Sequence, residues 1–236
     1  VGVPEFFFGT PTFIIEPFCN VRQGRSRTLF KACSFRNVRL LFREGLHPLF
    51  WLAFSRPGPI FSGGGNMEFR RAVEDDISRI MEIIEQARAY FRSKGIDQWQ
   101  NGYLNPDIIG SDIKNNYGYV LLKDNKIIAT VAVSFDGEKT YEKIYGGRWI
   151  TDGEYAVIHR LAVDNGYKGQ GIASVILEHI EELCIANGVY SIKVDTHEDN
   201  LSMQRLLEKN NFVHFGIIYL EDGSKRLAYE KVLFYK

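Results

Sequence analysis

The segment that most restricts the fold of this chain is a strand-like run that enters a glycine-bearing turn and then an amphipathic helix. Residues 153–163 are rich in aliphatic side chains, three glycines lie between residues 165 and 171, and residues 171–186 carry apolar side chains at helical spacing. Glycine lets the backbone approach a ligand closely, and the free N–H groups at a helix N-terminus attract anions. The sequence therefore predicts an anion-binding loop at residues 168–173.

This loop differs from the two commonest nucleotide-binding loops. A Walker loop needs a glycine, four residues and Gly-Lys-Ser/Thr, and a dinucleotide fingerprint needs Gly-x-Gly-x-x-Gly close behind its strand. Here the loop reads Lys-Gly-Gln-Gly-Ile-Ala from Lys168 to Ala173. We therefore expect neither a Walker-type nor a Rossmann-type site.

The periodicity of residues 67–236 predicts a mixed α/β domain. Asp75 and Asp76 favour a helix start because their charges suit the positive end of the helix dipole, and Gly95 favours the end of that helix. The order β-α-α-β-β-β-α-β-α-β-β predicts a central sheet with helices on its faces. The expected strands lie at 68–72, 117–122, 126–134, 153–163, 190–195, 212–220 and 227–234, and the expected helices at about 76–95, 105–116, 171–186 and 200–209.

The first 66 residues differ in composition from the rest. They hold eight Lys and Arg against three Glu, and they contain 11 of the 17 Phe and six of the seven Pro. They show no sustained helical or strand periodicity, and a glycine run precedes Met67. A basic and aromatic stretch can bind nucleic acid. We favour a different interpretation, in which residues 1–66 are an over-extended start or leader outside the native fold, or a poorly ordered extension, and residues 67–236 form the domain.

Bulk properties exclude several classes of protein. The formal net charge is zero, and the longest apolar stretch, at 46–54, is too short to span a bilayer. Three cysteines at 19, 33 and 184 show no metal-ligand spacing and cannot form a full disulfide set. We therefore expect a cytoplasmic protein that binds neither nucleic acid, membrane nor metal. A homodimer is compatible with the sequence, because dimers are the commonest closed assembly.

Two motifs in this domain resemble the GNAT superfamily of N-acetyltransferases. The family's Arg/Gln-x-x-Gly-x-Gly/Ala reads here Lys168-x-x-Gly171-x-Ala173, with Lys at the first position. The family's Asn-x-x-Ala-x-x-Leu-Tyr-x-Lys-x-Gly-Phe resembles the segment from Asn200 to Phe212. The resemblance covers about residues 67–236. It implies a GNAT-like mixed sheet and acetyl-CoA as co-substrate.

The resemblance also implies which residues hold acetyl-CoA. Backbone groups around Leu161 and Val163 would align the pantetheine arm like an added strand. Amides from Gly169 to Ser174 would hold the pyrophosphate, and Asn200 would contact the arm near the thioester. The implied cofactor-binding residues are Leu161, Ala162, Val163, Lys168, Gly169, Gln170, Gly171, Ile172, Ala173, Ser174 and Asn200.

His159 is the preferred catalytic base. Strand alternation would put Tyr155, Val157, His159 and Leu161 on one face, which in GNAT-like folds faces the substrate. A histidine near its ordinary pKa suits proton removal from an amine at neutral pH. A histidine packed inside the sheet is an equally weighted alternative. Glu154 is a second catalytic candidate through a water relay, and a solvated surface carboxylate is its alternative.

The proton donor to the CoA thiolate is unassigned. Many family members have a tyrosine where this chain has Leu207, and leucine cannot donate a proton. Water, Tyr219 or Tyr229 could serve instead.

Other polar and aromatic residues are open to two interpretations. Asp195, His197 and Glu198 could bind the substrate amine, although capping of the next helix is commoner. Four aromatic residues could line an acceptor pocket or belong to the core: Trp99, Tyr103, Tyr117 and Tyr119.

The resemblance predicts an enzyme that moves an acetyl group from acetyl-CoA directly to a primary amine of a small molecule or peptide. The net charge of −5 over residues 67–236 mildly favours a cationic acceptor. One alternative is transfer of a longer acyl group or acylation of protein N-termini. The other is a non-catalytic domain that binds acyl-CoA as a sensor, motivated by Leu207.

Overall fold

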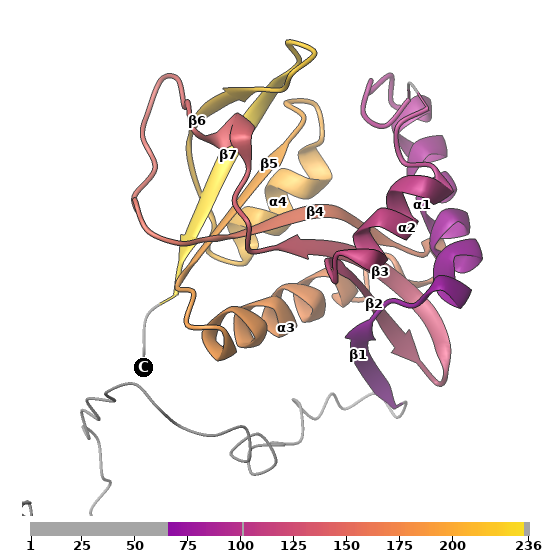
Figure 1. Cartoon of the computed structure of the whole chain (residues 1–236). Helices are drawn as coiled ribbons and strands as arrows, with labels where there is room; N and C mark the ends of the chain where they lie inside the picture. The colour runs from indigo at the N-terminus through magenta and orange to yellow at the C-terminus, as the bar shows by residue number, and fades with distance from the viewer. Residues whose placement is uncertain (1–65, 101, 234–236) are drawn as a thin grey trace, which may run out of the picture. The chain divides into compact units, whose positions relative to one another are not determined.

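The computed structural model describes residues 66–100 and 102–233, and its elements follow the expected order (Figure 1). The expected extension at 1–66 lies almost wholly outside the described residues, so that prediction stays a prediction. The strands are β1 (Met67–Arg71), β2 (Gly118–Lys123), β3 (Lys126–Ser134), β4 (Ala156–Val163), β5 (Ser191–Thr196), β6 (Val213–Tyr219) and β7 (Lys225–Val232). The α-helices are α1 (Ile77–Ser93), α2 (Pro106–Lys114), α3 (Ile172–Ala186) and α4 (Leu201–Lys209), with short 3-10 turns at Glu74–Asp76, Lys139–Tyr141 and Asn165–Tyr167.

Local sequence signals explain where several elements begin and end. The side chain of Asn105 accepts a hydrogen bond of 3.0 Å from the amide of Ile108, so it caps α2, whose first residue is a proline. Asp124 and Asn125 join β2 to β3 with positive φ angles of 50° and 63°. Asp and Asn tolerate this left-handed conformation better than other side chains, so they suit a tight hairpin.

The strands form one seven-stranded sheet in the order β1-β2-β3-β4-β5-β7-β6. All neighbouring strands are antiparallel except β4 and β5, which are parallel. The β4–β5 pairing is confined to Ala156 with Ile192 and Val157 with Lys193. Because β4 continues to Val163, its later residues have no partner on the β5 side, and the two strands diverge. The sheet therefore opens between its fourth and fifth strands.

Helices cover both faces of the sheet (Figure 1). On one face α3 and α4 pack on the strands, and Ile176, Ile180 and Leu207 are fully buried there. On the other face α1 and α2 pack on β2 and β3, and Ile80, Ile83 and Ile84 are buried there. Burial of such aliphatic side chains is the main favourable contribution to folding.

A β-bulge interrupts β4 in the middle. His159 lies opposite Ala132 and Ala162 lies opposite Thr130, so β4 has one more residue than β3 across this interval. Arg160 takes a positive φ of 58° there. The bulge reverses the alternation, and Leu161 packs with the α3 core whereas Val157 packs in a separate cluster with Tyr141. The expectation that Leu161 shares a face with Tyr155, Val157 and His159 is therefore wrong.

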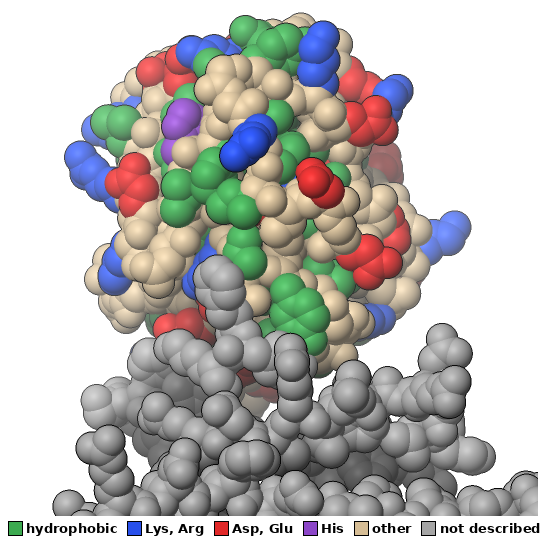
Figure 2. All heavy atoms as spheres, turned by 90° about the vertical axis from the view of Figure 1, so that its left-hand side faces the viewer, with side chains coloured by type: hydrophobic (Ala, Val, Ile, Leu, Met, Phe, Trp, Pro, Cys, Tyr) green, Lys and Arg blue, Asp and Glu red, His purple; other side chains and the backbone are tan. Residues whose placement is uncertain are grey.

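The long connection between β3 and β4 covers part of the edge strand β6. Tyr145 and Ile217 exchange two backbone hydrogen bonds of 2.8 and 2.9 Å. Gly147 lies so close to β6 that a Cβ there would be 1.6 Å from the carbonyl oxygen of Phe215. Figure 2 turns this side of the molecule to the viewer and shows apolar side chains beside charged ones of both signs. Within residues 66–100 and 102–233, no helix has the length and apolar character needed to cross a membrane.

Candidate active site

The loop that leads into α3 presents free backbone amides to solvent. Gly169 and Gly171 have φ angles of 78° and 81°, a conformation that strongly favours glycine, and Gly171 is the N-cap of α3. In the described part of the chain, no hydrogen bond uses the amides from Gly169 to Ala173. The loop is exposed, and the helix dipole adds partial positive charge at this end. Such a cluster of amides is suited to an oxyanion such as a pyrophosphate.

Two residues expected in this loop have further contacts. The Lys168 Nζ lies 5.0 Å from the centre of the Tyr90 ring, so α1 helps to position this exposed cation. Ser174 differs from the preceding residues because its amide donates to the carbonyl of Gly171 at 2.9 Å. Its hydroxyl accepts from the side-chain amide of Asn210 at 3.1 Å. The Ser174 amide is therefore already used by the helix.

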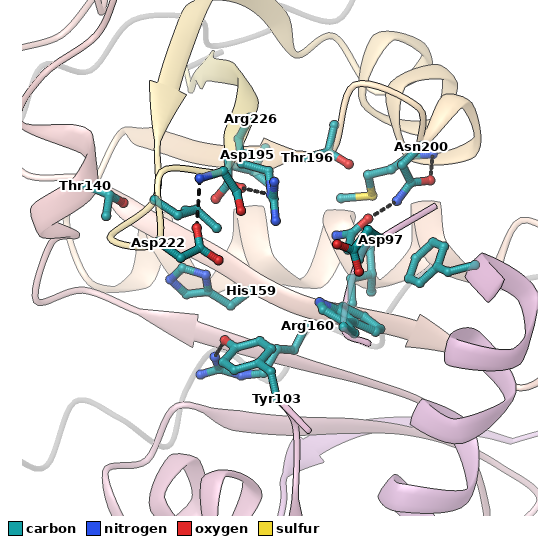
Figure 3. Close-up of a pocket in the computed structure, with 18 of the residues that line it drawn as sticks. Asp97, Tyr103, Thr140, His159, Arg160, Asp195, Thr196, Asn200, Asp222 and Arg226 are labelled. Carbon is teal, nitrogen blue, oxygen red and sulfur yellow. Dashed lines mark hydrogen bonds and ion pairs between the residues drawn. The ribbon is translucent and has the colours of Figure 1, made fainter. Parts of the chain in front are cut away.

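A cavity of about 480 Å³ lies where β4 and β5 diverge (Figure 3). Its walls come from both strands, from the start of α4, from the α1–α2 connection and from the β6–β7 hairpin. Leu161, a predicted cofactor residue, lines it, whereas Ala162 and Val163 continue along the open edge of β4. The unpaired backbone of this edge can accept an extended chain.

His159 lines this cavity but has a strongly lowered pKa. Its Nε2 lies 3.6 Å from a carboxylate oxygen of Glu138, and its side chain is 24% exposed. Burial, with the nearby positive charge of Arg160, lowers the pKa of His159 to about 4, and Glu138 opposes this only in part. The imidazole is therefore neutral at pH 7 and a weak base. The expectation of a histidine near its ordinary pKa is wrong.

Asp195 is the carboxylate most deeply placed in the cavity wall. One oxygen accepts a hydrogen bond of 2.7 Å from the hydroxyl of Tyr141, and the other lies 3.9 Å from Nε of Arg226. Burial raises the pKa of Asp195 above that of an ordinary carboxyl, although Tyr141 and Arg226 act in the opposite direction. A carboxylate of this kind can hold a proton nearer to neutral pH.

The structure separates Asp195 from the two polar residues that follow it in sequence. His197 accepts a hydrogen bond of 3.1 Å from the amide of Asp199, which is the loop-capping role. Glu198 pairs with Lys225 at 2.7 Å on the surface. No group of three His, Cys, Asp or Glu side chains in the described segments is arranged to hold a metal ion.

The bulge residue Arg160 fixes one wall of the cavity. It makes two bonds of 2.6 and 2.8 Å to the Asp112 carboxylate on α2 and donates to the Tyr103 hydroxyl at 2.8 Å. Trp99 and Tyr103 line the cavity, as one of the two interpretations expected. Tyr119 instead lies in the core at 6% exposure, and Tyr117 lies outside the lining.

The α1–α2 connection that carries these aromatic residues is held by Arg88. Its guanidinium donates to the carbonyl of Trp99 at 3.1 Å, to that of Leu104 at 2.7 Å, and to that of Tyr103. Trp99 and Leu104 both have positive φ angles, of 64° and 65°. Because this conformation is costly for such side chains, Arg88 stabilises a backbone path that would otherwise be unfavourable.

Asn200 and Thr196 present polar groups near the open end of β5. The Asn200 side chain caps α4 by accepting from Met203 at 3.2 Å, and it donates to Gln98 at 3.0 Å. Thr196 is 1% exposed. Its hydroxyl is the one fully buried side-chain polar atom without a hydrogen-bond partner in residues 66–100 and 102–233. Because both residues line the cavity, a bound molecule could satisfy this hydroxyl.

The remaining candidates lie away from the cavity. Glu154 is exposed and precedes β4, which begins at Ala156 rather than at 153, so the structure gives this carboxylate no place in the lining. Leu207 is fully buried in the core. Tyr219 is 46% exposed and Tyr229 is 2% exposed in the core, and neither lines the cavity. Position 207 therefore supplies no acid, and neither of the two tyrosines faces this space.

Solved structures resemble this chain over most of its described part. A GNAT-family acetyltransferase from Streptococcus agalactiae is 35% identical, with a TM-score of 0.66, and the match covers 72% of this chain and 96% of that one. A structure from Salmonella typhimurium with its cofactor acetyl-CoA shares the fold at 13% identity, with a TM-score of 0.53 over 72% of this chain and 95% of that one.

Two curated relatives from Bacillus subtilis are more distant in sequence. The S-alkylcysteine N-acetyltransferase is 26% identical over 114 residues, which are 48% of this chain and 58% of that protein. The S-(2-succino)cysteine N-acetyltransferase is 25% identical over 152 residues, or 63% of this chain and 85% of that protein. The chain thus spans less than two thirds of the first of these relatives. Residues 80–212 match the Acetyltransferase (GNAT) family. With its mixed seven-stranded sheet and this match, the chain belongs to the GNAT family of acetyltransferases.

Proposed function

We propose that this acetyltransferase moves an acetyl group from acetyl-CoA directly to a primary amine of a small molecule or peptide. The observation that carries the proposal is the divergence of β4 from β5. A loop of free amides lies at the N-terminus of α3, and the cavity lies where the strands diverge. A molecule with an anionic end, a long amide-bearing arm and a reactive terminus fits this arrangement.

In this proposal the cofactor contacts follow the open edge of β4. Amides from Gly169 to Ala173 hold the pyrophosphate, with Lys168 beside them. The backbone of residues 161–163 bonds the pantetheine arm, and Asn200 and Thr196 meet its thioester end. A backbone N–H of the same β4 segment stabilises the negative charge that develops on the thioester oxygen.

The amine must lose a proton before it attacks, and we assign this proton to a carboxylate rather than to His159. An imidazole with a pKa of about 4 holds a proton weakly at neutral pH. Asp195 has a raised pKa and lines the cavity. Asp195→Asn should lower kcat by about 10²-fold or more, the usual contribution of general base catalysis, and His159→Ala should lower it less. Equal losses in the two variants would contradict this assignment.

Release of CoA thiol from acetyl-CoA across a panel of amines tests the function. The first compounds should be S-substituted cysteines, because the two curated relatives are named for them. Amine-dependent thiol release is the expected result. Acetyl-CoA binding without turnover of any acceptor would favour a sensor. Faster reaction of longer acyl-CoA or of peptide N-termini would favour the other transferase classes.

A further inference from the structure

We propose that Arg226 and Asp195 together bind the carboxylate and the ammonium group of an α-amino acid, whose own α-amine is the acceptor. This inference rests on the proposed function and names its substrate class. It follows from the unused donors of Arg226, from the charge beside them and from the other side chains of the cavity wall.

Arg226 is a nearly buried cation with few partners. Its side chain, on β7, is 10% exposed. One Nη1 hydrogen is donated to the carbonyl of Lys225 at 2.9 Å, and Nε lies 3.9 Å from the Asp195 carboxylate, which is too long for a hydrogen bond. A guanidinium has five N–H donors. Only one of them therefore has an acceptor among the described residues.

Arg226 lines the cavity, and its free nitrogens keep some exposed surface. In the described residues the hydroxyl of Thr196 is the one fully buried side-chain polar atom without a partner, so the free nitrogens of Arg226 are not fully buried. Figure 3 shows Arg226 and Asp195 together at one side of the cavity. A planar guanidinium at such a site is suited to bind a carboxylate through two parallel hydrogen bonds.

Asp195 supplies the complementary negative charge. Tyr141 holds one of its oxygens, and the other oxygen lies beside Arg226. An α-amino acid carries a cation and an anion on the same carbon atom, so its two charges match this neighbouring pair. A simple amine would leave the donors of Arg226 without an acceptor.

Every bond and proton in the proposed transfer can be accounted for with the amino acid, acetyl-CoA, Asp195 and solvent. The ammonium gives one proton to Asp195, and the neutral nitrogen attacks the thioester carbonyl carbon. The nitrogen–carbon bond forms and the carbon–sulfur bond breaks, and the second nitrogen proton ends on the CoA thiolate. The products are an N-acetyl amino acid and CoA thiol, and the proton on Asp195 returns to solvent.

The rest of the wall restricts the side chain of the acceptor. Trp99, Ile158, Leu161, Val194 and Met203 provide apolar surface. Four further carboxylates line the cavity, on Asp97, Glu138, Glu221 and Asp222, and they would repel a second carboxylate on the acceptor. We therefore infer an α-amino acid whose side chain carries no negative charge and has apolar groups that can contact this surface.

The experiment compares L-methionine with 3-(methylthio)propylamine, the amine that lacks only its carboxylate. Binding to the CoA-loaded protein is measured by calorimetry, and acetylation by thiol release from acetyl-CoA. We expect the full chain to prefer L-methionine in both measurements by about 10- to 100-fold, the discrimination given by charge-assisted hydrogen bonds. Arg226→Gln should abolish the preference for L-methionine. Arg226→Lys keeps the positive charge but not the paired guanidinium N–H donors, and it should retain part of the preference. Arg148→Gln removes an exposed arginine outside the lining and should leave the ratio unchanged.

Equal binding and turnover of the two compounds by the unaltered chain would overturn the proposal without any variant, while leaving amine acetylation intact. If Arg226→Gln does not fold, the comparison of the two compounds and the Arg226→Lys variant still test the proposal. If L-methionine binds in a way that depends on Arg226 but is not acetylated, the result would support the amino-acid site at Arg226 and Asp195 and contradict the proposed function. If the protein neither binds nor acetylates L-methionine, the inference is wrong.

Discussion

Replacement of Gly171 by alanine separates the binding role of the α3 loop from its structural role. A Cβ at this position would meet nothing within 4 Å, so the fold has room for it. The φ of 81° remains a left-handed conformation that costs about 1–2 kcal/mol for a residue with a side chain. For a domain of this size that loss lowers Tm by roughly 2–8 °C.

The effect of Gly171→Ala on cofactor binding should exceed this loss. The added methyl group would project from the exposed N-cap beside the amides that have no other partner. Loss of one hydrogen bond to a charged phosphate is worth about 1.5–3 kcal/mol, so the Kd for acetyl-CoA should rise about 10- to 100-fold. Calorimetric titration with acetyl-CoA measures this change directly, and thermal unfolding without ligand measures the stability.

Gly188→Ala is the matched control. Gly188 follows the C-terminal end of the same helix, has a φ of 74° and also has nothing within 4 Å of an added Cβ. Both variants should lose similar stability, and only Gly171→Ala should lose affinity. If acetyl-CoA binds Gly171→Ala as tightly as it binds Gly188→Ala, the loop is not the pyrophosphate site.

Three further substitutions test other parts of the structure. The pKa of His159 is 6.5 in the unfolded chain and about 4 in the folded one, so the unfolded state binds more protons as the pH falls through this window, and stability is lost there. His159→Gln should remove up to about 3 kcal/mol of this loss, as measured by urea unfolding at pH 7 and pH 4. An NMR titration midpoint near 6.5 for His159 would contradict the reasoning. Arg88→Met should release the backbone of Trp99 and Leu104 and raise the KM of the acceptor about 10-fold, with the KM of acetyl-CoA nearly unchanged. If steady-state kinetics show equal increases in the two KM values, the α1–α2 connection does not act on the acceptor alone. Leu207→Tyr should destabilise the fold by about 1–3 kcal/mol without raising kcat, because the position is fully buried in the core. A higher kcat in this variant would mean that residue 207 reaches the thiolate.

The order of helices and strands could be predicted from the sequence because each element repeats a simple local pattern. The stripe of aliphatic residues in α3 and the Asp124-Asn125 turn are signals of this kind. The bulge at Arg160 could not be found in this way. The bulge is visible only in the pairing with β3, and the partner that holds Arg160 there, Asp112, is 48 residues away in sequence.

The polar groups of the cavity depend still more on tertiary contacts. The low pKa of His159 results mainly from burial, which strand alternation does not reveal. The sequence places Asp195 only beside its neighbours His197 and Glu198, whereas its partners Tyr141 and Arg226 lie on the β3–β4 connection and on β7. An aspartate in a strand that is otherwise mostly buried was the one available signal.

The contact of Gly147 with β6 also bears on how the protein avoids aggregation. An edge strand with unpaired amides can recruit a strand from another molecule, and the Tyr145–Ile217 bridge occupies part of that edge. Since the Phe215 carbonyl oxygen lies where a side chain at 147 would begin, any larger residue would push the connection away from the strand. Replacement of Gly147 by a larger residue would therefore leave the backbone groups of this β6 edge open to pairing with another molecule.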